Sequence, residues 1–275
     1  MKTCILSISL NRLASLLQTA VLASSAGVVS AQAFDQTYEN YDRVLKTYVA
    51  DGRVNYSGLK NAPKALEVYL ESAAEVPEEQ FNAWTESQRL AFLINLYNAG
   101  TLKLIIDHYP VKSIKDIGSL FKGPWDQQAV KLFGKTITLN HLEHDILRKQ
   151  YSEPRLHMVL VCAAKGCPQL RGKAYTADKL DEQFSDQSRR YLVSPAGLRI
   201  DREKQIVYFS SIFKWYGEDF IARYSPATGF AGIDKTERAV ANFCSAFLVS
   251  ADRDYLTAGE YAVKFLDYDW SLNEK

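Results

Sequence analysis

The sequence has little cysteine, no cluster of basic residues and none of several common catalytic motifs. It contains four cysteines in 275 residues, and its 33 lysines and arginines nearly balance its 32 aspartates and glutamates. A near-neutral chain without a basic cluster is not expected to bind nucleic acid. The patterns G-x-S-x-G, H-E-x-x-H and C-x-x-C and the Walker phosphate-binding loop are all missing. These motifs therefore assign no function to the chain.

The first 33 residues predict a signal peptide. Lys2 and Arg12 supply positive charge, residues 13–29 are mostly small and apolar, and Ala31-Gln32-Ala33 has the A-x-A form of a cleavage site. We expect cleavage after Ala33, or alternatively after Ala31, and a periplasmic or secreted protein. An uncleaved N-terminal anchor is the other interpretation. Cleavage would leave 31 basic residues against 32 acidic ones, a net charge of −1.

Residues 34–275 are expected to form a single domain that does not contact a membrane. They contain no internal repeat, no low-complexity tract, no linker rich in proline or glycine and no long uninterrupted apolar span. An uninterrupted apolar span of about 18 residues would be needed to suggest membrane crossing. About 240 residues suffice for one domain with a substantial hydrophobic core.

The pattern of apolar residues predicts an α+β fold that is mostly helical, with a small mixed or antiparallel sheet. The most apolar helix, 89–106, follows a capping box at Thr85-Glu86-Ser87-Gln88. Because hairpins and helices do not alternate regularly, a doubly wound sheet is not expected. The other predicted helices are 35–49, 62–74, 140–150, 176–193, 212–224 and 235–251; the hairpins are 129–139, turning at Gly134-Lys135, and 198–209; single strands are 156–162 and 263–268.

The most informative segment is the apolar run from Leu156 to Cys162, followed by four small or polar residues and then Cys167-Pro168. A buried strand that ends in a loop is a common place for catalytic groups. A cysteine before proline can cap a helical turn, where the helix dipole favours a thiolate. A disulfide between Cys162 and Cys167 is also within reach of so short a loop. The segment therefore predicts a thiol site, a small disulfide or two inert thiols, whereas Cys244 is expected to be buried and inert.

Two asparagines interrupt the most apolar helix. Asn95 and Asn98 are three residues apart, so their amides point the same way. Buried amides require hydrogen-bond partners. They either hold loops from inside the core or line a pocket.

The histidines allow several interpretations. His141 and His144 are three residues apart at a helix start, a spacing that could hold a metal ion or simply be solvated. Alternatively, His144 is a general base that Glu143 or an asparagine orients. His157 is separated from Cys162 by about 16 Å if the segment is a strand, and odd spacing places the two on opposite faces. They would meet only if the loop folds back.

Five segments in order resemble domain of unknown function family 547: AFLINLYNA, NHLEHDILR, CAAKGCP, WYGEDF and YDWSLN. The likeness runs from about Gly52 to Asn273. It implies no established activity, but it draws attention to the positions that match its pattern. These are Asn95, Tyr97, Asn98, Glu143, His144, His157, Cys162, Cys167, Trp215, Tyr216 and Asp219. His141 is not among them, which weakens the metal interpretation.

We predict an exported thiol-dependent hydrolase or acyl transferase that acts on a small-molecule or peptide substrate without a metal or other cofactor. Cys167 is the predicted nucleophile, His144 its base and Glu143 the orienting group. The pocket or its surroundings are expected to contain Asn95, Asn98, His157, Cys162, Trp215, Tyr216 and Asp219.

Two alternatives come from other classes of protein. One is a non-catalytic periplasmic binding or scaffold module in which a Cys162–Cys167 disulfide shapes a loop. The other is a metal-binding protein that uses His144, His157 and a cysteine thiolate.

Overall fold

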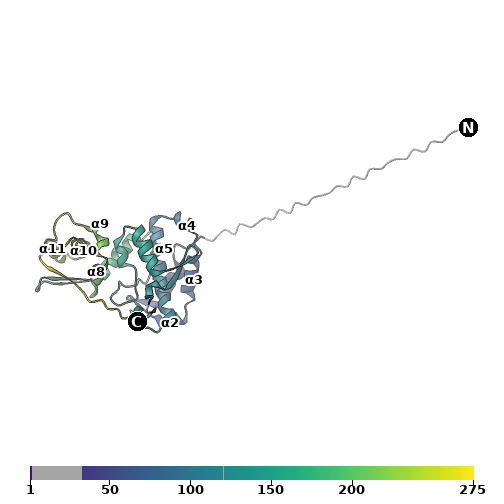
Figure 1. The fold of residues 1–275 in the computed structure, drawn as a ribbon, viewed down its shortest axis with the longest axis horizontal. Helices are drawn as coiled ribbons and strands as arrows, with labels where there is room; N and C mark the ends of the chain where they lie inside the picture. Colours follow the sequence, from purple (N-terminus) through teal and green to yellow (C-terminus); the bar gives the residue numbers. More distant parts are fainter. Residues whose placement is uncertain (2–32, 120) are drawn as a thin grey trace. The chain divides into compact units, whose positions relative to one another are not determined.

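The computed structural model describes Met1 and residues 33–119 and 121–275, and Figure 1 shows its fold. The predicted signal peptide and its cleavage sites lie outside the described residues, apart from Met1 and Ala33. Residues Phe34–Lys275 form one compact unit. This unit is mostly helical with small sheets, which confirms the predicted α+β class.

Most of the secondary-structure elements along the chain are helices. The α-helices are α1 (Glu39–Tyr48), α2 (Tyr56–Asn61), α3 (Lys64–Ala74), α4 (Glu78–Asn82), α5 (Glu86–His108), α6 (Arg148–Gln150), α7 (Leu180–Leu192), α8 (Ser211–Tyr216), α9 (Ile221–Tyr224), α10 (Lys235–Ser245) and α11 (Ser250–Ala258). Short 3₁₀ turns are η1 (Ile114–Asp116), η2 (Pro124–Asp126), η4 (Pro154–Met158) and η5 (Gly217–Phe220), and η3 (His141–Leu147) is a π-helix.

The strands form three small sheets. They are β1 (Val49–Ala50), β2 (Arg53–Val54), β3 (Gln128–Leu132), β4 (Lys135–Thr138), β5 (Leu198–Asp201), β6 (Ile206–Phe209) and β7 (Ala262–Phe265). β1 pairs with β2 and β3 with β4, each pair being antiparallel. In the third sheet β6 lies between antiparallel β5 and parallel β7. This last sheet is therefore small and mixed.

Helix α5 is the centre of the core. It begins at the predicted capping box, where Thr85 and Gln88 exchange backbone and side-chain hydrogen bonds. Every residue from Leu90 to Leu102 is buried. The helix is long and apolar enough to cross a membrane, but 89% of its most apolar window is covered by the protein. Burial on all sides thus explains its composition.

Close packing against α5 depends on a glycine. A Cβ atom added at Gly100 would lie 2.4 Å from Cγ1 of Val130 in β3. The β3–β4 hairpin therefore rests directly on the α5 backbone. Its turn has positive φ at Phe133 and Gly134, as a two-residue turn between twisted strands requires. The predicted turn at Gly134-Lys135 was wrong by one residue.

The predicted strand 156–162 is wrong. Residues Pro154–Met158 form the 3₁₀ turn η4, and residues 159–162 have no regular structure. Side chains of α5 replace the partner strand: Asn98 donates to the Val159 carbonyl and accepts from the Val161 N–H, both at 3.0 Å. Thr101 donates to the Val161 carbonyl at 3.2 Å. The segment is apolar because the core surrounds it, and that pattern alone does not distinguish a strand from an irregular buried segment.

Three further helix predictions required correction. The expected helix 212–224 is divided into α8 and α9 by the 3₁₀ turn η5. The expected helix 235–251 is divided into α10 and α11, with a separate turn between them. The expected helix 140–150 is π-helical in its first part and becomes α-helical only at α6. Figure 1 shows α8 to α11 gathered at the opposite end of the unit from α2, α3 and α4, with α5 between them.

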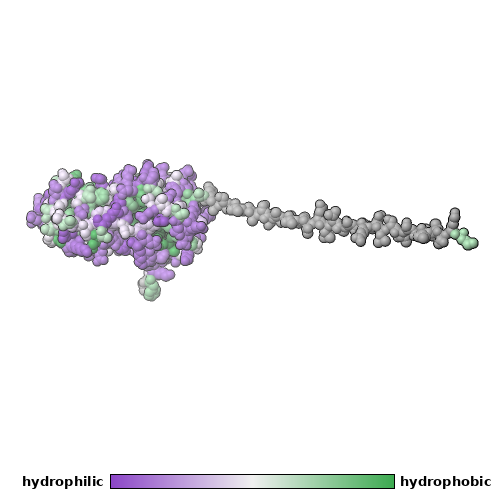
Figure 2. Space-filling model, turned by 90° about the horizontal axis from the view of Figure 1, so that it is seen from above, coloured by the Kyte–Doolittle hydropathy of each residue, from purple (hydrophilic) through white to green (hydrophobic). Residues whose placement is uncertain are grey.

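The C-terminal segment returns across the molecule to the loop that contains the cysteines. The N–H of Lys165 donates to the Ser271 carbonyl, and the N–H of Asn273 donates to the Ala163 carbonyl. Asn273 also accepts through its carbonyl from Val54 of β2, and the C-terminus lies near α2 in Figure 1. The face of the molecule that Figure 2 shows is largely hydrophilic, with scattered apolar residues. The C-terminal segment, which β2 holds in turn, thus covers the loop of residues 162–167, called the cysteine loop below.

We expect Asn98→Ala to lower the free energy of unfolding by about 2–4 kcal/mol, because two buried backbone groups lose their partners and each unmet group costs about 1–3 kcal/mol. Urea denaturation followed by circular dichroism measures this change. Asn242→Ala is the matched control, since its amide makes one half-buried hydrogen bond to the Tyr224 carbonyl, and it should cost about 1 kcal/mol. Equal effects of the two variants would contradict a special role for Asn98.

Candidate functional site

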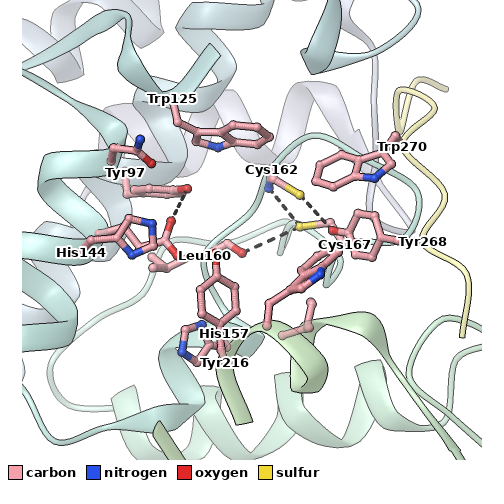
Figure 3. A pocket seen from close by; sticks show the side chains of 14 residues that line it. Tyr97, Trp125, His144, His157, Leu160, Cys162, Cys167, Tyr216, Tyr268 and Trp270 are labelled. Carbon is pink, nitrogen blue, oxygen red and sulfur yellow. Dashed lines mark hydrogen bonds between the residues drawn. The ribbon is translucent and has the colours of Figure 1, made fainter. Parts of the chain in front are cut away.

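A cavity of about 260 Å³ lies between η3, the cysteine loop, α8 and the C-terminal segment. Figure 3 shows its side chains: thiols on one side, a histidine and a carboxylate on the other, and aromatic rings between them. The lining residues are Tyr97, Trp125, Asn140, Glu143, His144, His157, Leu160, Cys162, Cys167, Ile212, Trp215, Tyr216, Tyr268 and Trp270.

Cys162 is positioned by the backbone on both sides of it. Asn98 holds the preceding residue, Val161, from within the core. The following residue, Ala163, has a φ of 58°, a left-handed conformation that is uncommon for residues other than glycine. This reverses the chain so that Gly166 approaches the C-terminal segment, where a Cβ atom would lie 2.9 Å from the Asp269 backbone nitrogen. The turn brings both cysteines to the same wall.

The two thiols have different surroundings. Cys162 is half-buried, and its sulfur lies 3.0 Å from the Tyr268 hydroxyl. Cys167 is buried; its sulfur accepts from the Cys162 N–H at 2.9 Å and lies 3.8 Å from the Leu160 carbonyl oxygen. The hydrogen bond from Cys167 lowers the pKa of Cys162 and outweighs the opposing effect of burial, and Tyr268 lowers it further. Burial raises the pKa of Cys167, as does its contact with Cys162. Cys162 therefore ionises first.

Neither cysteine is in a disulfide. Cys162, Cys167 and Cys244 are all free thiols, and Cys244 is buried in α10. The disulfide alternative thus describes a bond that the structure does not contain. The two thiols form a hydrogen-bonded pair instead.

Glu143 does not orient His144. Glu143 lies in the π-helix η3 and is 9% exposed, and its Oε2 accepts a 2.7 Å hydrogen bond from the Tyr97 hydroxyl of α5. Arg148 is the residue that contacts His144, with its Nη1 placed 2.9 Å from Nδ1 of the imidazole. The predicted orienting role of Glu143 is therefore corrected. Both Glu143 and His144 line the cavity, and π-helical turns are frequent at functional sites.

The contact with Arg148 decides the tautomer of His144. A guanidinium group only donates hydrogen bonds, so Nδ1 of His144 must accept. Neutral His144 then has its proton on Nε2, the nitrogen left for the cavity. In this arrangement His144 donates a hydrogen bond to a bound molecule and does not accept a proton from a thiol.

Asp219 of η5 does not line the cavity, but it joins two elements next to it, α6 and η4. It binds Arg148 with both oxygens, at 2.8 and 2.9 Å, and His157 Nε2 at 2.7 Å. The His157 ring stacks on Tyr216 with centroids 4.4 Å apart. Burial would raise the pKa of Asp219, but the hydrogen bonds from His157 and Arg148 outweigh it and hold that pKa well below its usual range. The carboxylate fixes α6, η4 and η5 relative to one another.

The structure unites most of the predicted site residues in one cavity. Those that line it are Glu143, His144, His157, Cys162, Cys167, Trp215 and Tyr216. Asp219 contacts the lining residues from behind. Asn95 and Asn98 are at most 1% exposed and do not line the cavity; they hold backbone segments from inside the core, and Asn98 does so directly before Cys162.

Several site residues were not predicted from the sequence. Trp125 lies in η2 and Arg148 at the start of α6, and neither has a local pattern that indicates a pocket. Tyr268 and Trp270 were part of a recognised segment, but only the tertiary structure places them beside Cys162. His157 shares the cavity with Cys162 because the segment between them is not a strand. Within the described part of the chain, no hydrogen bond joins a histidine to a cysteine sulfur.

The metal alternative lacks a set of ligands. Among residues 33–119 and 121–275, no group of three histidine, cysteine, aspartate or glutamate side chains is placed to hold a metal ion. His157 is hydrogen-bonded to Asp219, and His141 pairs with Asp145 at the surface. The predicted ligands therefore already have protein partners.

The fold and the cavity define an α+β domain with a thiol pair in an aromatic pocket. Residues 81–192 match the model of the family described as "Protein of unknown function, DUF547". The match confirms the resemblance over a shorter range than Gly52 to Asn273. It includes the cavity-lining residues up to Cys167, among them Glu143 and Cys162, but not those that come later in the chain. Neither the curated proteins nor the solved structures gave a match to this chain.

We expect Asp219→Asn to destabilise the protein at pH 7 by about 1–2 kcal/mol, less than a fully buried pair because water screens a carboxylate that is 30% exposed. The native Asp219 carboxyl binds a proton less readily than the unfolded one, so its stabilisation is complete above its ordinary pKa of 3.8 and is lost as pH falls below that value. Urea unfolding of both proteins between pH 7 and pH 3 should show their difference shrinking in acid. A difference that is constant with pH would contradict this role of the charge.

Proposed function

We propose that the protein is a thiol-dependent hydrolase or acyl transferase with Cys162 as its nucleophile. The observation that supports this most directly is the pairing of two thiols at the cavity wall, of which the half-buried one has the lowered pKa. A thiolate is the reactive form of cysteine, and enzymes lower the pKa of the residue that must attack. The nucleophile is thus assigned to Cys162 and not to Cys167.

Cys167 and Tyr268 are positioning residues in this proposal. Both place a donor next to the sulfur of Cys162, and such donors stabilise the thiolate. Cys167 itself is poorly placed to attack, because it is 7% exposed and burial raises its pKa. The backbone N–H of Cys162 also points at the Cys167 sulfur, which fixes the geometry of the pair.

The reaction that this cavity supports is transfer of an acyl group through a thioester. The sulfur of Cys162 forms a bond to the carbonyl carbon of a small-molecule or peptide substrate, and the bond from that carbon to the leaving group breaks. The proton lost by the thiol departs with the leaving group. Water or a second acceptor then attacks the thioester, releases the acyl product and restores the thiol.

His144 and Glu143 have complementary roles in these steps. The Nε2–H of His144 is available to donate to the carbonyl oxygen as negative charge develops on it. The Glu143 carboxylate accepts from Tyr97 through Oε2, which leaves its other oxygen for the substrate. The base predicted at His144 is not needed in this proposal, because Cys162 attacks as the thiolate that Cys167 and Tyr268 stabilise.

We expect Cys162→Ser to lower kcat/KM for an activated ester such as p-nitrophenyl acetate by about 10³-fold or more, because a serine hydroxyl is far less ionised than this thiol. Cys244→Ser is the matched control and should keep full activity, since Cys244 lies in α10 away from the cavity. Hydrolysis equal in Cys162→Ser and the native protein would contradict the proposal.

Alkylation by iodoacetamide, mapped by mass spectrometry without reductant, distinguishes the two cysteines. Cys162 should react first, and Cys167→Ala should move the pH midpoint of that reaction upward because Cys162 loses a donor. Faster labelling of Cys167 would restore the nucleophile predicted from the sequence. Labelling of both only after reduction would favour the disulfide-containing binding module.

The proposal also includes export to the periplasm or secretion, supported by the charge and composition of residues 1–33. We expect the protein recovered from the periplasm or medium of an expressing bacterium to begin at Phe34 or Gln32. N-terminal peptide mapping checks this. An intact Met1 on protein that remains in the cytoplasm would contradict it.

A further inference from the structure

We infer that the cavity binds a primary ammonium group, carried on a short alkyl chain of the substrate, between the Glu143 carboxylate and the aromatic rings. This inference deepens the proposed function and rests on it for the reaction that follows, whereas the binding itself requires no chemistry at Cys162.

The charge inside the cavity favours a cation. No lysine or arginine lines it, and Glu143 is its only lining aspartate or glutamate. A carboxylate that is 9% exposed is costly without partners. Tyr97 donates to Oε2, but no side chain or backbone group in the described part of the chain donates to Oε1. An ammonium N–H would supply that donor as well as the compensating charge.

Aromatic side chains surround the cavity. Figure 3 shows Trp125, Trp270, Tyr268 and Tyr216 around it, and Trp215 and Glu143 line the same cavity. The faces of such rings attract cations, most strongly those of tryptophan. A purely apolar substrate would use the same rings but would leave the Glu143 carboxylate unpaired.

The protein already shows these rings binding cations. The Lys115 Nζ lies 3.8 Å from the centre of the Trp270 ring, and the Arg148 guanidinium lies 4.8 Å from the centre of Tyr216. Both cations approach from outside the set of lining residues. A substrate ammonium would make the same kind of contact from within the cavity with the tryptophan rings, because His157 and Arg148 already lie against Tyr216.

Charge also disfavours the opposite class of substrate. A carboxylate or phosphate in the cavity would meet the Glu143 carboxylate and the thiol that ionises first, with no lining lysine or arginine to offset them. The cavity volume of about 260 Å³ is large enough for a short alkyl chain. A primary alkylamine group, as on a diamine or a lysine side chain, meets both requirements.

The test measures binding of n-butylammonium and of its neutral counterpart n-butanol to the Cys162→Ser variant, with indole fluorescence and NMR titration as readouts. We expect n-butylammonium to bind at least about ten-fold more tightly than n-butanol. Glu143→Gln, which keeps an acceptor for Tyr97, should remove about ten-fold of the amine affinity and leave n-butanol unchanged. Glu218→Gln is the control for net charge, because Glu218 is exposed and does not line the cavity.

A second variant keeps the test decisive if Glu143→Gln does not fold, as judged by circular dichroism. Trp215 is 46% exposed at the rim, and Trp215→Leu should weaken amine binding about three-fold or more without weakening n-butanol. Equal affinity for amine and alcohol, or amine binding that none of the cavity variants alters, would overturn the inference.

The outcomes also separate this inference from the proposed function. Amine binding that depends on Glu143, in a protein whose Cys162 shows no reactivity, would support the ammonium site and contradict the proposed thiol enzyme. Ester hydrolysis that depends on Cys162, in a cavity that does not prefer amines, would support the proposed enzyme and contradict the ammonium site.

Discussion

The side-chain amide of Asn98 lies within the core helix α5 and forms two hydrogen bonds with the backbone of residues 159 and 161. Backbone groups in a dry core must be paired, and a neighbouring strand normally provides the partners. Here the helix side chain does so, and Thr101 adds a third bond. This is why an irregular segment can lie at the centre of the domain and still present Cys162 to a cavity.

Asn95, one turn earlier on the same helix, does the same for a second segment. Its amide exchanges two hydrogen bonds with the backbone of Tyr175, at 2.8 and 2.9 Å. The chain between these two attachment points contains both cysteines. Helix α5 therefore acts as a rigid template for the cysteine loop, and the C-terminal segment covers the loop from the other side. Residues far apart in the sequence become neighbours because both are tied to this loop.

Electrostatics divide the cavity into two parts. Arg148 is neutralised by Asp219 and leaves His144 as a neutral donor. On the opposite side the thiol pair favours the thiolate of Cys162, whereas the Glu143 carboxylate lies with His144 on η3. Groups that differ in this way are useful for acyl transfer, because one end of the cavity stabilises charge on oxygen while the other end provides the nucleophile.

Local patterns predicted the elements whose stability is local. The capping box at Thr85 fixed the start of α5, and the hairpin β5–β6 and helix α7 followed from periodicity and turn residues. The strand predicted at 156–162 failed because burial on all sides gives the same apolar pattern in a strand and in a segment held by Asn98. Glu143 was recognised as a site residue, but its partner was not, since Tyr97 comes from a helix 46 residues earlier.

The sequence by itself determined the α+β class, the core helix, the family resemblance and about half of the residues of the cavity, because periodicity, capping and motif spacing are properties of neighbouring residues. Only the tertiary structure decided which cysteine ionises first, which residue orients His144 and what lines the opposite wall. Those properties depend on burial and on distances between groups such as Cys162 and Tyr268, which lie 106 positions apart in the chain and 3.0 Å apart in the fold.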